Sequence, residues 1–552
     1  MSQTLVKVKQ ETDADQLKRA FVKVTAEVAQ EIKQDLTLED LARFKPLIEH
    51  LKITTEDLNQ WLEDEDLFWP FNGLSKFYRE QGLYKEAIPY LEQCLTITEQ
   101  RLGNEHPTVT SALNNLGSLY ESQGKYSEAE PLLVRSLSIR EKQLGTDHLD
   151  VANTLNSLAL VYESQGKYSE AEPLYLRALS IQEKQLGTDD PYVAETLNNL
   201  AALYYFQGKY NEAEPFYLRA ISIQEKQLEA DHPRLAISLN GLASLYKSQG
   251  KYNEAEPLLV RSLSIREKQL GVDHPYVANA LNNLGSLYKS QEKYSEAEPL
   301  LQQSLSLLEQ KLGADHPNVA TILSNLAGLY ELQGKYNEAE PLLLRCLEID
   351  KKALGEEHPY FASSLNILAS LYNFQGKYEE AKPLYLRSLA IWEKQLGENH
   401  PHVATNLNNL AALYVFQGKY EEAEPLYLRS LSIKENLLGI NHPDIAISLN
   451  NIAAFYYAQG KYEEAEPLYQ RSLSIRENLL GVNHPDIAIS LNNLAELYRS
   501  QGRYEEAEPL YRKAITITNQ TFDTNHTNTQ IAITNYFSML SQISDKKLQP
   551  ES

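Results

Sequence analysis

Apolar residues recur along the chain with a helical spacing, and the same pattern returns every 42 residues. In the second copy, Leu113, Leu116, Gly117 and Tyr120 are separated by three, one and three positions, which places them on one face of an α-helix. The stretch 123–125, Gln-Gly-Lys, then ends that helix, because glycine accepts backbone angles that other residues resist. Ten of the eleven copies have this glycine, and Glu292 replaces it in the other.

The apolar pattern resumes directly after the turn and predicts a second helix over 126–144. Its apolar positions are Ala129, Leu133, Leu137 and Ile139. Each copy is therefore predicted to be a helical hairpin. A fixed period of about 20 to 50 residues is typical of a solenoid, in which each unit contacts only its neighbours.

This periodicity divides the chain into three parts. Residues 65–518 hold the eleven copies, 1–64 are expected to form an N-terminal helical cap, and 519–552 a C-terminal capping helix and tail. The final helix is predicted over 528–543, and the tail from Ser544 is expected to be disordered.

The N-terminal segment has weaker signals. Thr37 and Thr54 are candidate N-caps for two helices, predicted over 38–50 and 55–62. An earlier heptad-like pattern covers fewer than three heptads, too few for a coiled coil: Leu17, Phe21, Val24 and Val28.

The repeated residues carry a family resemblance. The order Leu113-x-x-Leu116-Gly117-x-x-Tyr120, followed by Ala129-x-x-x-Leu133, is similar to the tetratricopeptide pattern, although the usual repeat is about 34 residues long. The 42-residue period, with His-Pro-x-Val-Ala-x-x-Leu-Asn-Asn-Leu-Ala-x-Leu-Tyr over 400–414, resembles the repeats of kinesin light chains. The resemblance covers roughly 65–518. It implies an all-α, right-handed superhelical solenoid whose first helices line a concave groove that binds an extended peptide.

That resemblance also implies a function. A relative of kinesin light chains is expected to be a cytoplasmic, cytoskeleton-associated adaptor that links cargo to a microtubule motor, with kinesin heavy chain as a partner. The family uses a long N-terminal heptad region to bind the motor, and residues 1–64 contain nothing of that length. A general scaffold for a signalling or assembly complex therefore stays open. Residues 1–64 are too few to build a core and an enzyme site of their own.

Composition and charge exclude other classes. The formal net charge of -23 argues against a nucleic-acid surface, which needs clustered Lys and Arg. No stretch is apolar enough to cross a bilayer, and no signal peptide is evident. Cys94 and Cys346 lie six periods apart in a column of small residues, so we expect them to be buried and unpaired.

The recurring histidines predict structure rather than chemistry. Residues such as His106 and His400 share one column, one hairpin apart, so they cannot converge on one metal ion. Asp190 takes the same position once, and proline usually follows it, as expected at a helix start. Because the sequence also lacks a phosphate loop, a nucleophile motif and paired Cys ligands, no catalysis, metal or cofactor is expected.

Two columns of asparagine on the first helix are the candidate peptide-binding residues. A polar amide flanked by core leucines needs a partner, which could be the backbone of an extended peptide. The alternative is a structural ladder between adjacent hairpins. The first column is Asn114, Asn156, Asn198, Asn240, Asn282, Asn366, Asn408, Asn450 and Asn492. The second is Asn115, Asn199, Asn283, Asn325, Asn409, Asn451 and Asn493.

Positions that vary between copies in the last turn of the first helix are candidates for specificity. Aromatic and apolar residues there could anchor a ligand or pack against neighbouring second helices. Two lysines could bind an acidic ligand residue. These positions are Tyr205, Phe206, Lys247, Lys289, Phe374, Val415, Phe416 and Tyr457.

Overall fold

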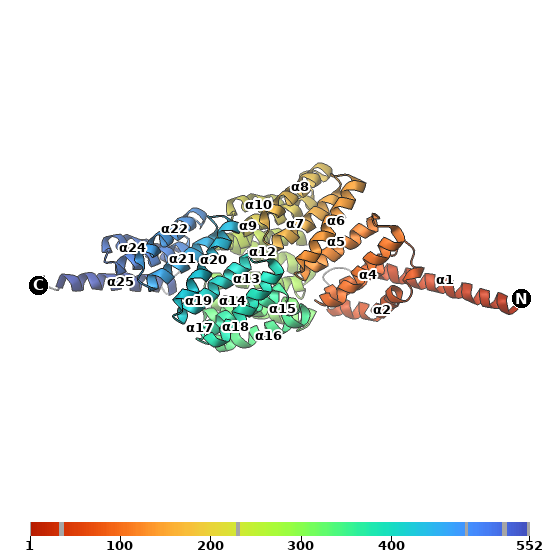
Figure 1. Ribbon diagram of the computed structural model, residues 1–552. Helices are drawn as coiled ribbons and strands as arrows, with labels where there is room; N and C mark the ends of the chain where they lie inside the picture. The colour runs from red at the N-terminus through yellow and green to blue at the C-terminus, as the bar shows by residue number, and fades with distance from the viewer. Residues whose placement is uncertain (1, 33–37, 228–231, 481–483, 522–526, 549–552) are drawn as a thin grey trace. The chain divides into compact units, whose positions relative to one another are not determined.

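The computed structural model describes residues 2–32, 38–227, 232–480, 484–521 and 527–548. Over these ranges it contains α-helices and one short 3-10 helix, and no strand. The predicted all-α solenoid is confirmed (Figure 1).

The helices alternate in order as predicted, and pairs such as α5 and α6, or α21 and α22, pack as hairpins. The first helices of the hairpins are α3 (Trp69–Arg79), α5 (Pro107–Ser122), α7 (Leu149–Ser164), α9 (Pro191–Phe206), α11 (Pro233–Ser248), α13 (Pro275–Ser290), α15 (Pro317–Leu332), α17 (Pro359–Phe374), α19 (Pro401–Phe416), α21 (Pro443–Ala458) and α23 (Pro485–Ser500). The second helices are α4 (Tyr84–Leu102), α6 (Tyr126–Leu144), α8 (Tyr168–Leu186), α10 (Tyr210–Gln227), α12 (Tyr252–Leu270), α14 (Tyr294–Leu312), α16 (Tyr336–Ala353), α18 (Tyr378–Leu396), α20 (Tyr420–Leu438), α22 (Tyr462–Leu480) and α24 (Tyr504–Thr521).

Most first helices begin and end at the same signals. At the start of α5, the His106 Nδ1 accepts a hydrogen bond from the Thr108 N–H at 3.2 Å, which confirms the predicted helix-start role of the histidine column. At the end, Gly124 adopts a φ of 65° and the Lys125 N–H donates to the Tyr120 carbonyl at 2.8 Å. This is a left-handed helix cap, which favours glycine.

The one copy without glycine keeps the same turn. Glu292 has a φ of 56°, and the Lys293 N–H donates to the Tyr288 carbonyl at 2.9 Å. Glutamate is strained in this left-handed region, by about 1 kcal/mol or more. The array therefore imposes the turn on a residue that disfavours it.

Small residues let the two helices of a hairpin approach closely. Ala129 and Leu133 are fully buried, and a Cβ added to Gly117 would lie 2.8 Å from the Leu133 Cγ. Cys94 and Cys346 are buried in the small-residue column, as predicted, and burial raises the pKa of each thiol to about 12.

Neighbouring hairpins stack with their first helices on the inner side. Second helices pack on the next first helix, as α6 does on α7, and first helices also contact one another, as α5 does α7 and α21 does α23. The first helices therefore lie closer together than the second helices. The side chains on their open face form the inner surface of the stack.

The chain divides into two compact units. The first unit is Met1–Thr196, Arg266–Asn282 and Leu301–Ile367, and the second is Leu197–Ile265, Asn283–Leu300 and Leu368–Ser552. All contacts described below lie within one unit.

The N-terminal helix α1 (Ser2–Glu31) buries a face that matches the expected one only in part. Leu17 and Val24 of the predicted heptad pattern are 71% and 57% exposed, whereas Phe21 and Val28 are half-buried. The buried face consists of smaller side chains at neighbouring positions of the helix, because the alanines of α1 pack on α3. Its apolar residues are Val22, Ala26 and Ala29, followed by Ile32.

The predicted pair of short helices after α1 is wrong. One helix, α2 (Leu38–Glu56), runs through Thr54, followed by the 3-10 helix η1 (Asn59–Trp61). Thr54 is buried, and its Oγ1 donates to the His50 carbonyl at 3.0 Å and shares a hydrogen bond with the Thr25 Oγ1 at 2.8 Å. It therefore joins α2 to α1 instead of capping a helix. Thr37 lies outside the described residues.

The C-terminal helix α25 (Thr527–Leu548) packs on α23 and α24. It continues past Ser544, so the expected disorder is wrong for 544–548, and 549–552 lie outside the described residues. Nowhere in the described chain is a helix long and apolar enough to cross a membrane.

Candidate peptide-binding face

The first asparagine column joins each repeat to the next one. The Asn156 Nδ2 donates to the Thr196 Oγ1 at 2.8 Å, and that hydroxyl donates to the Gln182 Oε1 at 2.7 Å. Asn198 donates in the same way to the Ser238 Oγ at 2.7 Å. In these two repeats the amide binds a buried hydroxyl on the first helix of the following repeat, whereas Ala280 and Ile322 stand at the hydroxyl position for Asn240 and Asn282.

The second column joins each repeat to the preceding one. The Asn325 Nδ2 donates to the Asn282 Oδ1 at 2.8 Å, and Asn451 donates to Asn408 at 3.2 Å. Equivalent bonds link Asn115 to Asn72, Asn493 to Asn450 and Asn535 to Asn492. The other predicted members are half-buried: Asn199, Asn240, Asn283, Asn366 and Asn409.

These bonds make the two columns an amide ladder between repeats, the alternative that the sequence left open. Within the described residues, the ladder is incomplete in four repeats. The Oδ1 atoms of Asn114, Asn156, Asn198 and Asn240 are buried without a hydrogen-bond partner; Ser157 and Gly241 stand at two of the donor positions, and asparagine stands at the other two. Contact of the columns with a peptide stays a prediction.

A polar column of the second helices completes the ladder, and sequence reasoning missed it. Its side chains reach the serine or threonine that follows 14 residues later, as the Arg476 Nη1 reaches the Ser490 Oγ at 2.8 Å. The same pairing occurs in Arg140–Thr154, Gln224–Ser238, Asp350–Ser364 and Lys434–Ser448. A polar residue at this otherwise buried position in most copies was the available signal.

Three of the predicted specificity residues pack within the repeats. The Tyr205 hydroxyl bonds the Ser248 Oγ at 2.9 Å, and the Tyr457 hydroxyl bonds the Ser500 Oγ at 2.8 Å. Val415 packs against the core between α20 and α21. The two tyrosine hydroxyls thus bond the next first helix rather than a neighbouring second helix, and contact of these side chains with a ligand stays a prediction.

The phenylalanines of the set are exposed. Phe206, Phe374 and Phe416 are 47%, 56% and 60% exposed. Phe416 lies parallel to Tyr378, with ring centroids 6.4 Å apart. They occupy the last residue of their first helices, beside the Gln-Gly-Lys turn.

Charged residues in the last turn of the first helices are partly shielded from water. In the second unit, the Lys247 Nζ donates to the Ser286 Oγ at 3.1 Å, and burial and then the charge of Lys289 lower its pKa. In the first unit, burial raises the pKa of Glu163 to about 7, although the Tyr175 hydroxyl donates to this carboxyl at 3.1 Å. The last turns thus carry a half-buried lysine in the second unit and a half-buried glutamate in the first.

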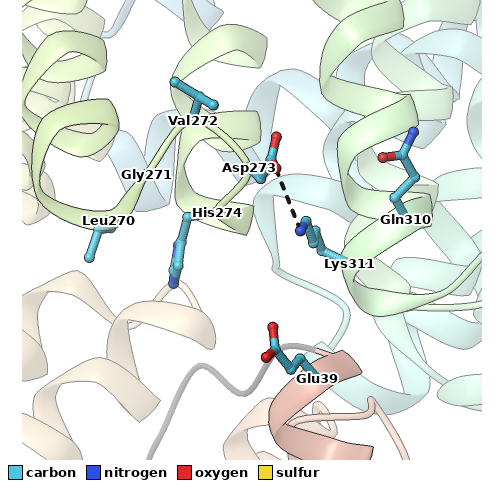
Figure 2. A pocket seen from close by; sticks show the side chains of 8 residues that line it. All are labelled: Glu39, Leu270, Gly271, Val272, Asp273, His274, Gln310 and Lys311. Carbon is cyan, nitrogen blue, oxygen red and sulfur yellow. Dashed lines mark ion pairs between the residues drawn. The ribbon is translucent and has the colours of Figure 1, made fainter.

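Metal ligands and pockets are the other places where chemistry could occur. In the described ranges, no group of three or more His, Cys, Asp and Glu residues could hold a metal ion. A pocket of about 510 Å³ lies at the loop between α12 and α13, where Lys311 pairs with Asp273 at 3.8 Å (Figure 2). Its lining is an open loop surface without a nucleophile and base in contact.

Comparison with protein families identifies the class. The tetratricopeptide repeat family model matches 66–142, 109–184, 150–226, 192–268, 234–310, 276–352, 360–436 and 444–520, and a second tetratricopeptide model matches 408–478. The chain belongs to the tetratricopeptide repeat family. Such repeats generally serve as scaffolds for protein interaction rather than as enzymes.

Solved structures give the more particular likeness, to kinesin light chain repeats. The "nearly identical TPR-like repeats" of a Podosopora anserina protein described as a kinesin light chain are 30% identical, covering 35% of this chain and 92% of that one, with a TM-score of 0.31. BtubC (BKLC) from P. vanneervenii is 24% identical over 44% and 91%, with a TM-score of 0.33. A Rap protein complexed with competence and sporulation factor is 15% identical over 75% and 98%, with a TM-score of 0.44. No curated protein matches the chain.

Proposed function

We propose that this chain is a non-catalytic adaptor whose inner face binds an extended peptide segment with an acidic residue. The observation that supports it is the pair Lys247 and Lys289, on consecutive first helices of the second unit. Burial and mutual repulsion disfavour the charge on Lys247 in a chain of net charge -23. An acidic ligand residue would relieve that cost.

The ladder and the last turn have separate roles in this proposal. The ladder holds consecutive first helices in register, which spaces the last-turn residues evenly along the face. A peptide in extended form presents side chains at a regular rise and can meet such residues in turn.

The experiment is selection of a displayed random peptide library on the full chain, followed by titration of the selected peptides. We expect them to contain acidic residues and to bind Lys247→Gln/Lys289→Gln at least about tenfold more weakly. The control is Lys142→Gln/Lys184→Gln, which changes two exposed lysines of the outer helices. Equal binding to both variants would contradict the proposal.

A link to a microtubule motor is the second proposal, based on the His-Pro-x-Val-Ala motif shared with kinesin light chains. Its test is co-sedimentation of the full chain with purified kinesin heavy chain tail, scored against the same tail mixed with an unrelated tetratricopeptide protein. Retention above that background supports the motor link. Retention at background favours a general scaffold.

A further inference from the structure

Within each unit, the start of a first helix lies on the Gln-Gly-Lys turn of a distant repeat. The His358 Nδ1 accepts the bond that begins α17, so its Nε2 carries the proton and donates to the Ser122 carbonyl at 3.3 Å, 236 residues away. His316 contacts the Glu80 carbonyl at 3.2 Å. In the second unit, His442 contacts the Phe206 carbonyl at 3.1 Å. One type of contact therefore recurs in both units.

This contact, which we term the seam, is close. A Cβ added to Gly124 would lie 2.5 Å from the Pro359 Cδ, and one added to Gly208 would lie 2.7 Å from the Pro443 Cδ. The turns at Gly82, Gly124 and Gly208 are buried. The lack of a side chain at the turn is thus required both for its left-handed backbone and for the seam.

The first position of the seam involves the N-terminal cap. Glu39, near the start of α2, lines the same pocket as His274 and the loop 270–273 (Figure 2). The cap therefore lies next to His274, where the repeats offer no earlier turn.

The last turns of the array have no such cover. A Cβ added to Gly376 or Gly418 would meet no atom within 4 Å, and both glycines are exposed. Phe374 and Phe416, two residues before these glycines, are exposed, as is Phe206 before the covered Gly208. We term this surface the open turns.

The first histidines of the array are exposed, unlike the histidines of the seam. His106 and His148 begin their helices with the same Nδ1 hydrogen bond as His358 and His442. Their rings are exposed, while His358 and His442 are 5% and 8% exposed. The late repeats thus expose turns and the early repeats expose histidines, which are the two sides of the seam contact.

We propose that the open turns bind the His106 and His148 edge of a second copy of this chain, which gives head-to-tail association. The interface would be heterologous, with different surfaces on the two partners, so each copy keeps one free edge and growth does not close by itself. Phe206 shows that a phenylalanine before the turn is compatible with the seam, because its own carbonyl accepts from His442.

The residues beside the seam also match. In the second unit, Tyr210 begins α10 next to a covered turn, and burial, then Tyr205 and Asp444, raise the pKa of its hydroxyl. At the open turns, Tyr420 occupies the repeat position of Tyr210. On the histidine edge of the second molecule, Asp150 occupies the repeat position of Asp444. Val415 holds the place of Tyr205, so only the tyrosine–aspartate pair of this neighbourhood would be reproduced between two molecules.

The test uses the full chain with either edge blocked by charge. Phe374→Arg/Phe416→Arg blocks the open turns, and Thr108→Arg/Asp150→Arg blocks the histidine edge. Sedimentation equilibrium measures mass over a range of concentrations, after circular dichroism shows native helicity for each variant. Leu176→Arg/Leu218→Arg, at exposed positions of the outer helices, is the matched control.

We expect the mass of the native chain and of the control to rise with concentration, and each blocked variant to keep the mass of one chain. An equimolar mixture of the two blocked variants retains one usable edge of each kind and should reach the mass of two chains and no more. A native chain that keeps the mass of one chain overturns the proposal. So does a mixture that fails to associate, or a blocked variant that assembles like the native chain.

Discussion

His358 and His106 occupy the same position of the repeat and have different surroundings. Both accept a backbone hydrogen bond that begins a first helix. Only His358 is buried and donates a second hydrogen bond, to a carbonyl 236 residues away. The difference shows that the role of a repeated residue depends on its place in the array, which a single copy of the motif does not reveal.

The largest difference is expected between covered and open glycines. Gly124→Ala places a methyl group against Pro359 in a left-handed backbone, and we expect a loss of about 4 kcal/mol. Gly376→Ala has the same backbone strain and open space, so about 1 to 2 kcal/mol should be lost. Urea unfolding followed by circular dichroism measures both, and equal losses would contradict the importance of the seam.

Acid should weaken the covered part selectively. Burial lowers the pKa of His358 to about 4, from about 6.5 in the unfolded chain. Between these values the unfolded state binds the extra proton, so stability present above pH 6.5 falls as pH decreases, by up to about 3 kcal/mol near pH 4. Hydrogen exchange of α17 between pH 7 and 4.5 measures this.

The control for the acid effect is His358→Asn, which keeps an acceptor for the helix start and does not titrate in this range. Its exchange in α17 should vary less with pH than that of the native chain. The same pH dependence in both would show that other groups cause the effect.

The amide ladder occurs in both units, so removing one of its asparagines should cost about the same stability in either unit. Asn282→Ala in the first unit and Asn408→Ala in the second each leave a half-buried asparagine donor without its acceptor. We expect each to lose about 1.5 kcal/mol in urea unfolding. A change of less than about 0.3 kcal/mol would mean that these amides do not stabilise the stack.

The smallest effect is a gain. Glu292→Gly removes the strain of a left-handed glutamate and should raise stability by about 1 kcal/mol, measured as an upward shift of the urea midpoint. Glu296→Gly, in the first turn of α14, is the contrasting change and should destabilise by about the same amount.

The sequence was most informative where the signal is local. Helix α6 was predicted with its observed ends, because an apolar 3.6-residue period and the Gln-Gly-Lys turn mark it. The histidine helix starts and the buried cysteines were predicted for the same reason. Thr54 was misassigned as a helix start, because its partner Thr25 lies on another helix and local sequence does not contain that contact.

The candidate face was only partly predictable. The need of the asparagines for partners was evident, but their bonds join residues 40 and 43 positions apart, and either a ligand or a neighbouring repeat could meet that need. The seam was not predicted, because its partners are 236 residues apart and no motif in the sequence links them.

The two cysteines also provide natural probes of local opening. They are the only thiols in the chain, one in α4 and the other in α16, and each is buried with its pKa raised to about 12. An alkylating reagent attacks the thiolate, so it should react with either residue only when that hairpin opens. The labelling rates of Cys94 and Cys346, separated by mass spectrometry of the digested protein, would time the opening of an early and a later repeat without any engineered label.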